Sequence, residues 1–150
     1  MLLTDRKLYQ VLIAVVLIAA ASVLAHMHVV IQTYHPVTRI SSPEGLIFTA
    51  VQDAKKERRD CGQANERFLR PIKAQCKGCK VLIARCEREL EPFEQAIYQG
   101  EAIRLHQVFA VGVRLAIDGP PELARASCEL MANELVKQGV RSAHCLLPKK

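Results

Sequence analysis

The feature that most constrains this chain is a long uncharged apolar run close to its N-terminus. Residues 8–25, LYQVLIAVVLIAAASVLA, contain no charged residue, no glycine and no proline. A helix of this length rises about 1.5 Å per residue and spans roughly 27 Å, close to the hydrocarbon thickness of a bilayer. We therefore expect a single transmembrane anchor at residues 8–30, preceded by a short cytoplasmic stub at residues 1–7.

A cleaved signal peptide is the alternative for this run, because Val-Leu-Ala at residues 23–25 could serve as a cleavage site. The run is longer than the roughly 7–15 apolar residues of such peptides, which favours an uncleaved anchor. Arg6 and Lys7 precede the run, whereas the next cation after it is Arg39. The positive-inside rule then predicts a cytoplasmic N-terminus and an exported C-terminal part. A bacterial inner membrane, with that part in the periplasm, is our preferred setting.

Six cysteines in 150 residues suit an exported domain held together by disulfides. The chain has no Trp and few other aromatic residues, so its core is small and aliphatic, and cross-links that close long loops would each add about 2–4 kcal/mol of stability. We favour a Cys128–Cys145 pair, because Cys128 lies on the inward face of a predicted helix and Cys145 lies in the strand that returns beneath it. For the other four cysteines the pairing stays open: Cys61 is expected to bond to Cys76, Cys79 or Cys86.

A Cys-x-x-Cys pair such as Cys76 and Cys79 can also attach haem, exchange disulfides or bind zinc. A c-type haem anchor needs histidine directly after the second cysteine, and Lys80 excludes it. A thioredoxin-like pair begins a helix, whereas this one follows a predicted helix, although neighbouring lysines would favour a thiolate. Zinc bound by these two cysteines with Cys61 and Cys86 would lack a second close-spaced pair, and an oxidising compartment opposes free thiolates. Structural disulfides are therefore favoured, with redox exchange and zinc as alternatives.

Hydrophobic periodicity divides the remaining chain into a linker and one small domain. Residues 31–45 contain two prolines, two serines and a glycine, and are expected to be an extended linker. The exported domain then covers residues 46–148. Its expected elements are strands at 46–51, 80–86, 107–118 and 140–147 and helices at 52–75 and 121–139. This order predicts a ferredoxin-like βαββαβ fold of the α+β class, with an antiparallel sheet and both helices on one face.

The expected strand at 107–118 carries alternating apolar residues, as a half-buried strand does. We expect these residues on one side of the strand: Phe109, Val111, Val113, Leu115 and Ile117.

Charge is divided between a basic and an acidic stretch. Residues 55–80 hold nine cations and three acids, whereas residues 87–101 hold five acids and one arginine. We expect residues 87–103 to be an acidic insert with a short helix. The two stretches could pair within one domain or between copies, or the basic one could contact anionic lipid or glycan, although most such runs are solvated surface. The cations are Lys55, Lys56, Arg58, Arg59, Arg67, Arg70, Lys73, Lys77 and Lys80, and the first six are our candidate partner-binding residues.

We predict that the protein is not an enzyme and holds no cofactor or metal. No serine or cysteine stands in a nucleophile motif, the histidines are scattered, and no glycine-rich phosphate loop is present. His26-Met27-His28 could bind copper, but such residues at a helix end more commonly occupy the membrane interface. Nucleic acid is not expected as a partner, because the basic residues are not interleaved with aromatic ones.

A single anchor followed by a small exported domain is similar in general plan to accessory subunits of envelope machines such as secretion and pilus platforms, without any shared motif. We therefore expect a membrane-anchored periplasmic structural or assembly subunit that contacts lipid through residues 8–30, binds protein partners and can self-associate. One alternative is a module that binds an anionic envelope polymer or lipid through residues 55–80. Another is a thiol-disulfide exchange protein that uses Cys76 and Cys79.

Overall fold

The computed structural model describes residues 17–18 and 33–149. The chain forms two units, residues 1–32 and 33–150, and every strand and helix discussed below belongs to the second. The expected stub and anchor lie outside the described residues, apart from the helical Leu17 and Ile18. Within the part of the chain that is described, no helix combines the length and the apolar character needed to cross a bilayer.

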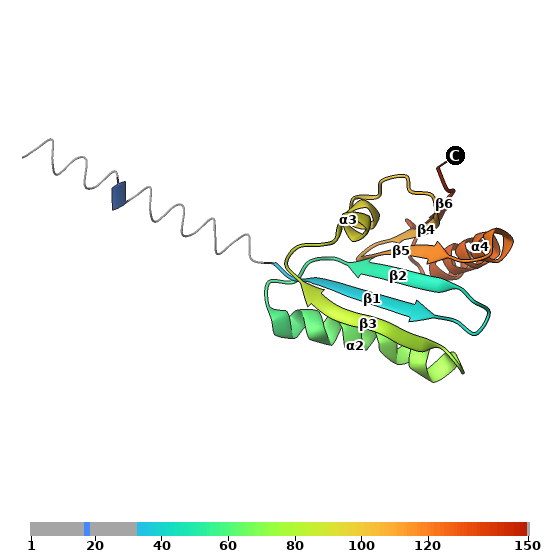
Figure 1. Cartoon of the computed structure of the whole chain (residues 1–150), viewed down its shortest axis with the longest axis horizontal. Coiled ribbons are helices and arrows are strands. Elements are labelled where there is room, and N and C mark those ends of the chain that lie inside the picture. Colours follow the sequence, from blue (N-terminus) through green and yellow to red (C-terminus); the bar gives the residue numbers. More distant parts are fainter. Residues whose placement is uncertain (1–16, 19–32, 150) are drawn as a thin grey trace, which may run out of the picture. The chain divides into compact units, whose positions relative to one another are not determined.

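The second unit is an α+β domain built on one antiparallel sheet of six strands (Figure 1). The sheet order is β3-β1-β2-β5-β4-β6, and all neighbouring strands are antiparallel. The strands are β1 (His35–Ser41), β2 (Ile47–Gln52), β3 (Lys80–Glu87), β4 (His106–Ala110), β5 (Val113–Asp118) and β6 (His144–Leu146). The helices are α2 (Arg58–Gln75), α3 (Pro92–Gln99) and α4 (Pro121–Lys137).

The first departure from the expected fold is β1, which occupies much of the segment that we assigned to a linker at residues 31–45. β1 lies inside the sheet and pairs with both β2 and β3. Its sequence, HPVTRIS, has only two aliphatic residues, so its strand character is weak when read alone. Val37 and Ile40 are nevertheless buried, because two neighbouring strands supply both the hydrogen bonds and the packing that stabilise this segment.

The second departure is that the expected strand at 107–118 is a hairpin. Gly112 adopts φ 85° in the turn, a left-handed conformation that costs glycine little because it has no Cβ. The turn divides the apolar residues that we expected on one side. Val113 and Leu115 face α2 and α4, whereas Val111 is exposed at the turn and Phe109 stacks against His144.

The observed element order is therefore not the ferredoxin-like βαββαβ pattern, although the α+β class, the antiparallel sheet and three disulfides are present. The chain instead contains two successive ββαβ units, β1-β2-α2-β3 and β4-β5-α4-β6, with α3 between them. In each unit the last strand pairs with the first, and the units join through β2 and β5. Each unit also has one disulfide from its helix to its last strand, Cys61–Cys86 in the first and Cys128–Cys145 in the second.

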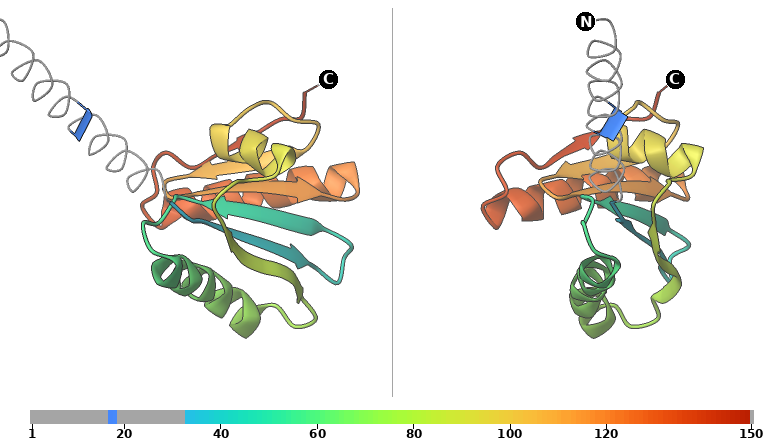
Figure 2. Two further views of the ribbon diagram at one scale, coloured as in Figure 1. Left: turned by 60° about the vertical axis from the view of Figure 1, so that its left-hand side comes forward. Right: turned by 90° about the vertical axis from the view of Figure 1, so that its left-hand side faces the viewer.

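Helices cover both faces of the sheet (Figure 2). On one face α2 packs over β1 and β3, and α4 packs over β4, β5 and β6. On the other face α3 covers β2 and β5, where Ile97 contacts Val37, Val51 and Ala116. The expectation that the two long helices share one face is therefore met. Because each long helix lies over its own half of the sheet, neither helix covers the middle of that face.

Candidate functional site

An apolar groove of about 870 Å³ lies between α2 and α4 on the sheet. Its floor is formed by side chains from four strands, Ile40 of β1, Phe48 of β2, Val108 of β4 and Leu115 of β5. The groove therefore spans the junction of the two ββαβ units. Binding sites commonly form at such junctions, and their usual volume is roughly 300–1,000 Å³.

The walls of the groove come from the two helices. Phe68 and Ile72 project from α2, and Met131 and Leu135 from α4. All four side chains are only partly buried. These residues line the open side of the apolar faces of α2 and α4. Helical periodicity identifies an apolar face, whereas the separation of two helices on a sheet depends on the number of strands between them.

Polar residues mark the rim of the groove. Ser42 and Glu44 stand on the β1–β2 loop at one end, and Ser127 and Glu134 stand on α4. A hydrogen bond from the Ser42 side chain lowers the pKa of Glu44, so this carboxylate is charged at neutral pH. Glu134 already accepts a hydrogen bond from Lys137 at 2.6 Å. The interior of the groove thus offers apolar contacts, and its polar groups are confined to the edges.

The Cys76–Cys79 disulfide also borders the groove, in the turn between α2 and β3. Cys76 ends α2, and its backbone N–H donates to the carbonyl oxygen of Ile72 at 2.8 Å. Gly78 adopts φ 94°, and a Cβ at this position would lie 2.9 Å from the side chain of Pro43. The turn is therefore packed closely against the β1–β2 loop at a position that only glycine fits.

The three disulfides differ in what they contribute to the fold. Cys61–Cys86 and Cys128–Cys145 join residues 25 and 17 apart in the sequence, whereas Cys76–Cys79 joins residues 3 apart. In the chain-entropy model the two long links each add about 3 kcal/mol of stability and the short one about 2 kcal/mol. The turn that follows α4 in the second unit contains Gly139, also at φ 94°, and has no disulfide. Cys76–Cys79 is therefore an addition to the framework that the two units share.

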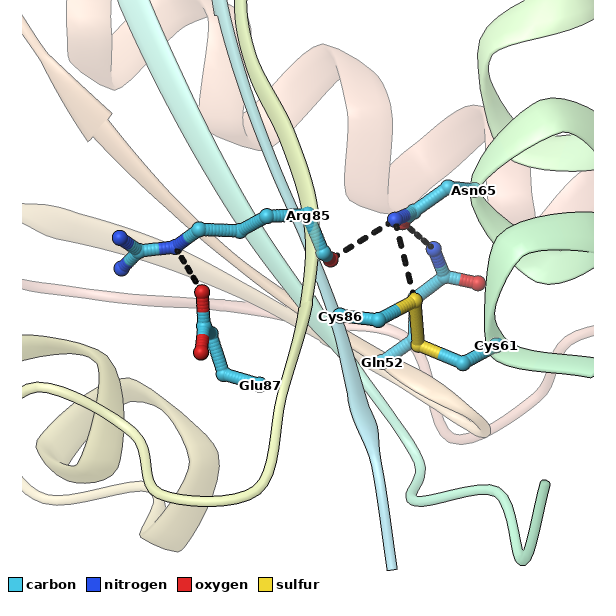
Figure 3. Close-up of a disulfide and its surroundings, with 6 residues drawn as sticks. All are labelled: Gln52, Cys61, Asn65, Arg85, Cys86 and Glu87. Atoms are coloured by element: carbon cyan, nitrogen blue, oxygen red, sulfur yellow. Dashed lines mark hydrogen bonds and ion pairs between the residues drawn. A yellow bond between two sulfur atoms is a disulfide. The ribbon is translucent and has the colours of Figure 1, made fainter. Parts of the chain in front are cut away.

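Figure 3 shows the Cys61–Cys86 disulfide, which selects one of the three partners that the sequence left open for Cys61. Asn65 of α2 lies beside it and donates from its side-chain amide to the carbonyl oxygen of Arg85 at 2.8 Å. Gln52 of β2 donates in turn to the side-chain oxygen of Asn65 at 3.3 Å. This polar contact and the disulfide fasten α2 to β3.

The Cys128–Cys145 disulfide is present as the sequence analysis expected. The four sulfurs of the zinc alternative do not gather at one point, since Cys61 and Cys86 form one disulfide and Cys76 and Cys79 form another. Across residues 33–149, no group of three or more His, Cys, Asp and Glu side chains has the arrangement of a metal site.

Three acidic residues of the 87–103 segment, Glu87, Glu91 and Glu94, form ion pairs within the domain, and α3 forms the expected short helix. Arg85 contacts Glu94 at 2.5 Å, Glu91 at 3.0 Å and Glu87 at 3.7 Å. Glu94 is fully buried, and with Glu91 it forms the capping box that begins α3. Partial burial lowers the pKa of Arg85, but the hydrogen bond to Glu91 and the charge of Glu94 outweigh it, so the net shift is upward.

The basic residues of the 55–80 stretch are not paired with these acids. Lys55 and Lys56 precede α2, and Arg59 makes exposed contacts with Glu57 at 3.8 Å and Asp60 at 3.7 Å. Several other cations of the stretch form no salt bridge to any described residue: Arg58, Arg67, Arg70, Lys73, Lys77 and Lys80. Complementarity between the basic and acidic stretches inside one domain is therefore not found among the described residues, and these cations face solvent or a partner.

Comparison with known proteins identifies no relative of this chain. No protein-family model matches the chain, and no curated protein or solved structure matches it. The candidate site therefore consists of the apolar groove, the Cys76–Cys79 disulfide at its edge and the unpaired cations of residues 55–80.

Proposed function

We propose that this protein is a membrane-anchored subunit of an exported assembly, and that its groove binds an amphipathic helix of a partner protein. The observation that carries the proposal is the open apolar groove between α2 and α4. The anchor and the periplasmic location are part of the proposal and rest on the sequence of residues 1–39.

The shape and chemistry of the groove support a helix as its occupant. Two helices over a sheet form a trough, and an amphipathic helix fills such a trough with apolar side chains spaced three and four residues apart. Leu130 of α4 extends the apolar surface outward, since it is 62% exposed and lies within one helical turn of Ser127 and Glu134 on the rim. Contiguous exposed apolar surface of this kind commonly marks an interaction site.

The cations of α2 favour a partner whose acidic side is turned toward α2, whereas Glu44 and Glu134 on the rim disfavour acidic side chains elsewhere in the groove. Arg67, Arg70 and Lys73 lie on α2 within one helical turn of the wall residues Phe68 and Ile72, and their exposed side chains are not part of the groove lining. On the opposite wall, Glu134 is already paired with Lys137. A helix with one apolar face and one acidic flank therefore complements both the groove and α2, and such complementarity sets the orientation and speeds association.

The test measures binding of a fluorescent synthetic peptide, an amphipathic helix with glutamates along one flank, to the full chain in mild detergent. Ile72→Gln is expected to weaken binding at least tenfold (about 1.4 kcal/mol), because it places a polar group in the wall. Ala74→Gln, at an exposed position of the same helix, is the matched control and should leave binding unchanged. Equal affinities for the two variants, or no binding to the unaltered chain, would contradict the proposal.

The same unpaired cations favour a second candidate, a module that binds an anionic envelope polymer or lipid through α2 alone. Vesicles containing phosphatidylglycerol distinguish the two. Binding to lipid through α2 would fall steeply with salt and be insensitive to Ile72→Gln. Binding of the acidic helix requires the apolar wall at every salt concentration.

A further inference from the structure

We infer that Cys76–Cys79 is a thiol-disulfide exchange site that acts on cysteine thiols of the polypeptide segment bound in the groove. This inference rests on the proposed function, because the groove holds the segment whose thiols react. The geometry that points to it is the position of both cysteines on the border of the groove, next to the end of the wall formed by α2.

Position beside the groove separates this disulfide from the other two. Cys61 and Cys128 are fully buried, and their partners Cys86 and Cys145 are partly exposed but do not line the groove, whereas Cys76 and Cys79 are both partly exposed and line it. Exchange requires a thiolate to approach one sulfur of the disulfide. Cys76–Cys79 is the disulfide that a thiol lying in the groove can reach.

The attachment of the long helices to the sheet does not depend on the Cys76–Cys79 disulfide. The two ββαβ units share one disulfide from the helix to the last strand, and Cys76–Cys79 has no counterpart in the turn after α4. Reduction of Cys76 and Cys79 therefore leaves both helices fastened to the sheet.

The local charges indicate which sulfur leaves. Cys76 lies at the C-terminus of α2, where the helix dipole disfavours a thiolate. Cys79 lies outside the helix and directly before Lys80, so the helix dipole does not disfavour a thiolate there in the same way. A substrate thiolate is thus expected to attack Sγ of Cys76 and displace Cys79, since the thiol of lower pKa leaves faster.

The reaction balances without another reagent. A first thiolate of the substrate forms a mixed disulfide with Cys76, and Cys79 takes up a proton. A second substrate thiolate then attacks the substrate sulfur of the mixed disulfide, and Cys76 leaves as a thiol. Two electrons and two protons have moved from the substrate dithiol to Cys76 and Cys79, and the substrate contains the new disulfide.

The first experiment compares the three disulfides of the full chain in glutathione buffers of increasing reducing strength, with alkylation of free thiols and peptide mapping. Cys76 and Cys79 are expected to become alkylated at a glutathione concentration at least tenfold lower than the other four cysteines. If all three disulfides open together, or Cys76–Cys79 opens last, the inference is wrong.

The second experiment follows one turnover between the oxidised full chain and the acidic amphipathic peptide carrying two reduced cysteines. We expect peptide oxidation to be at least tenfold slower with Ile72→Gln and absent with Cys76→Ser combined with Cys79→Ser, and acid quenching to place the mixed disulfide on Cys76. The inference is overturned if the chain oxidises the peptide no faster than it oxidises free dithiothreitol, or if the mixed disulfide forms on Cys79.

The same peptide with serines in place of cysteines separates the two proposals. If the serine peptide binds but the cysteine peptide is not oxidised, the exchange site is refuted and the binding function stands. If the serine peptide does not bind, the binding function is refuted, and exchange directed by the groove is refuted with it.

Discussion

Arg85 of β3 reaches the fully buried carboxylate of Glu94 on α3, with 2.5 Å between the guanidinium nitrogen and the carboxylate oxygen. The second carboxylate oxygen of Glu94 accepts a hydrogen bond from the backbone N–H of Glu91 at 3.2 Å. The Glu94 side chain thus both caps the start of α3 and joins α3 to the edge strand β3. The acidic segment that looks like a solvated surface in the sequence is therefore anchored by a buried ion pair.

We predict that Glu94→Ala lowers the free energy of unfolding by about 2–4 kcal/mol, because it removes the helix cap and leaves Arg85 without its buried partner. Urea denaturation measures the change. Glu89→Ala removes a nearby exposed glutamate and should change stability by less than about 0.5 kcal/mol. Similar losses for the two variants would show that the Arg85–Glu94 pair does not stabilise the domain.

The disulfides should contribute unequally to stability. Replacing Cys61 and Cys86 together by serine is expected to cost about 2–5 kcal/mol, since it frees a long loop and leaves a polar group at a fully buried position. The same replacement of Cys76 and Cys79 should cost no more than about 2 kcal/mol, because its loop is short and its sulfurs are partly exposed. Denaturant midpoints measured without reductant test the difference, and the reverse order would refute it.

His35 should make the domain less stable in mild acid. It packs edge-on against Tyr98 with ring centroids 4.7 Å apart, and its burial lowers its pKa more than the nearby Asp53 raises it. The unfolded chain therefore binds a proton at a higher pH than the folded one, so stability is complete above the ordinary histidine pKa of about 6.5 and is lost as the pH falls below it.

Thermal unfolding at about pH 7.5 and about pH 5.5 measures this effect. The midpoint of the unaltered chain should fall by a few degrees more than that of His35→Gln, whose side chain does not titrate in this range. A parallel decline in both proteins would assign the acid sensitivity to other groups.

Charge reversal should act more strongly beside the groove than at the start of α2. Arg67→Glu with Arg70→Glu is expected to weaken binding of the acidic peptide about tenfold at low salt, and less as salt screens the charges. Arg58→Glu with Arg59→Glu makes the same change in net charge about 15 Å away along the helix, so it should have a smaller effect. Equal losses would indicate attraction by net charge alone.

Parts of the fold follow from local patterns in the sequence. The Cys128–Cys145 disulfide could be predicted because the helical period and the strand period each place one cysteine on the inner side. α3 could be expected at residues 87–103 because its proline and acidic residues suit the first turn of a helix.

Other parts depend on contacts between distant segments. β1 is an interior strand because β2 and β3 pair with it on its two sides, and neither pairing can be predicted from residues 35–41 alone. The turn at Gly112 was missed because Val-Gly is a weak hairpin signal compared with Asn-Gly. The repeated ββαβ unit became evident only through the strand pairing. The groove follows from that repeat, since it lies between the two helices.

The central claim is that the groove between α2 and α4 is the binding surface, and methyl NMR of the full chain titrated with the acidic amphipathic peptide tests it most directly. We predict the largest shifts at Ile40, Ile72, Met131 and Leu135, which line the groove. Methyl groups on the opposite face of the sheet, such as those of Ile97 in α3, should not move. Shifts confined to the α3 face, or no shifts at a saturating peptide concentration, would contradict the account.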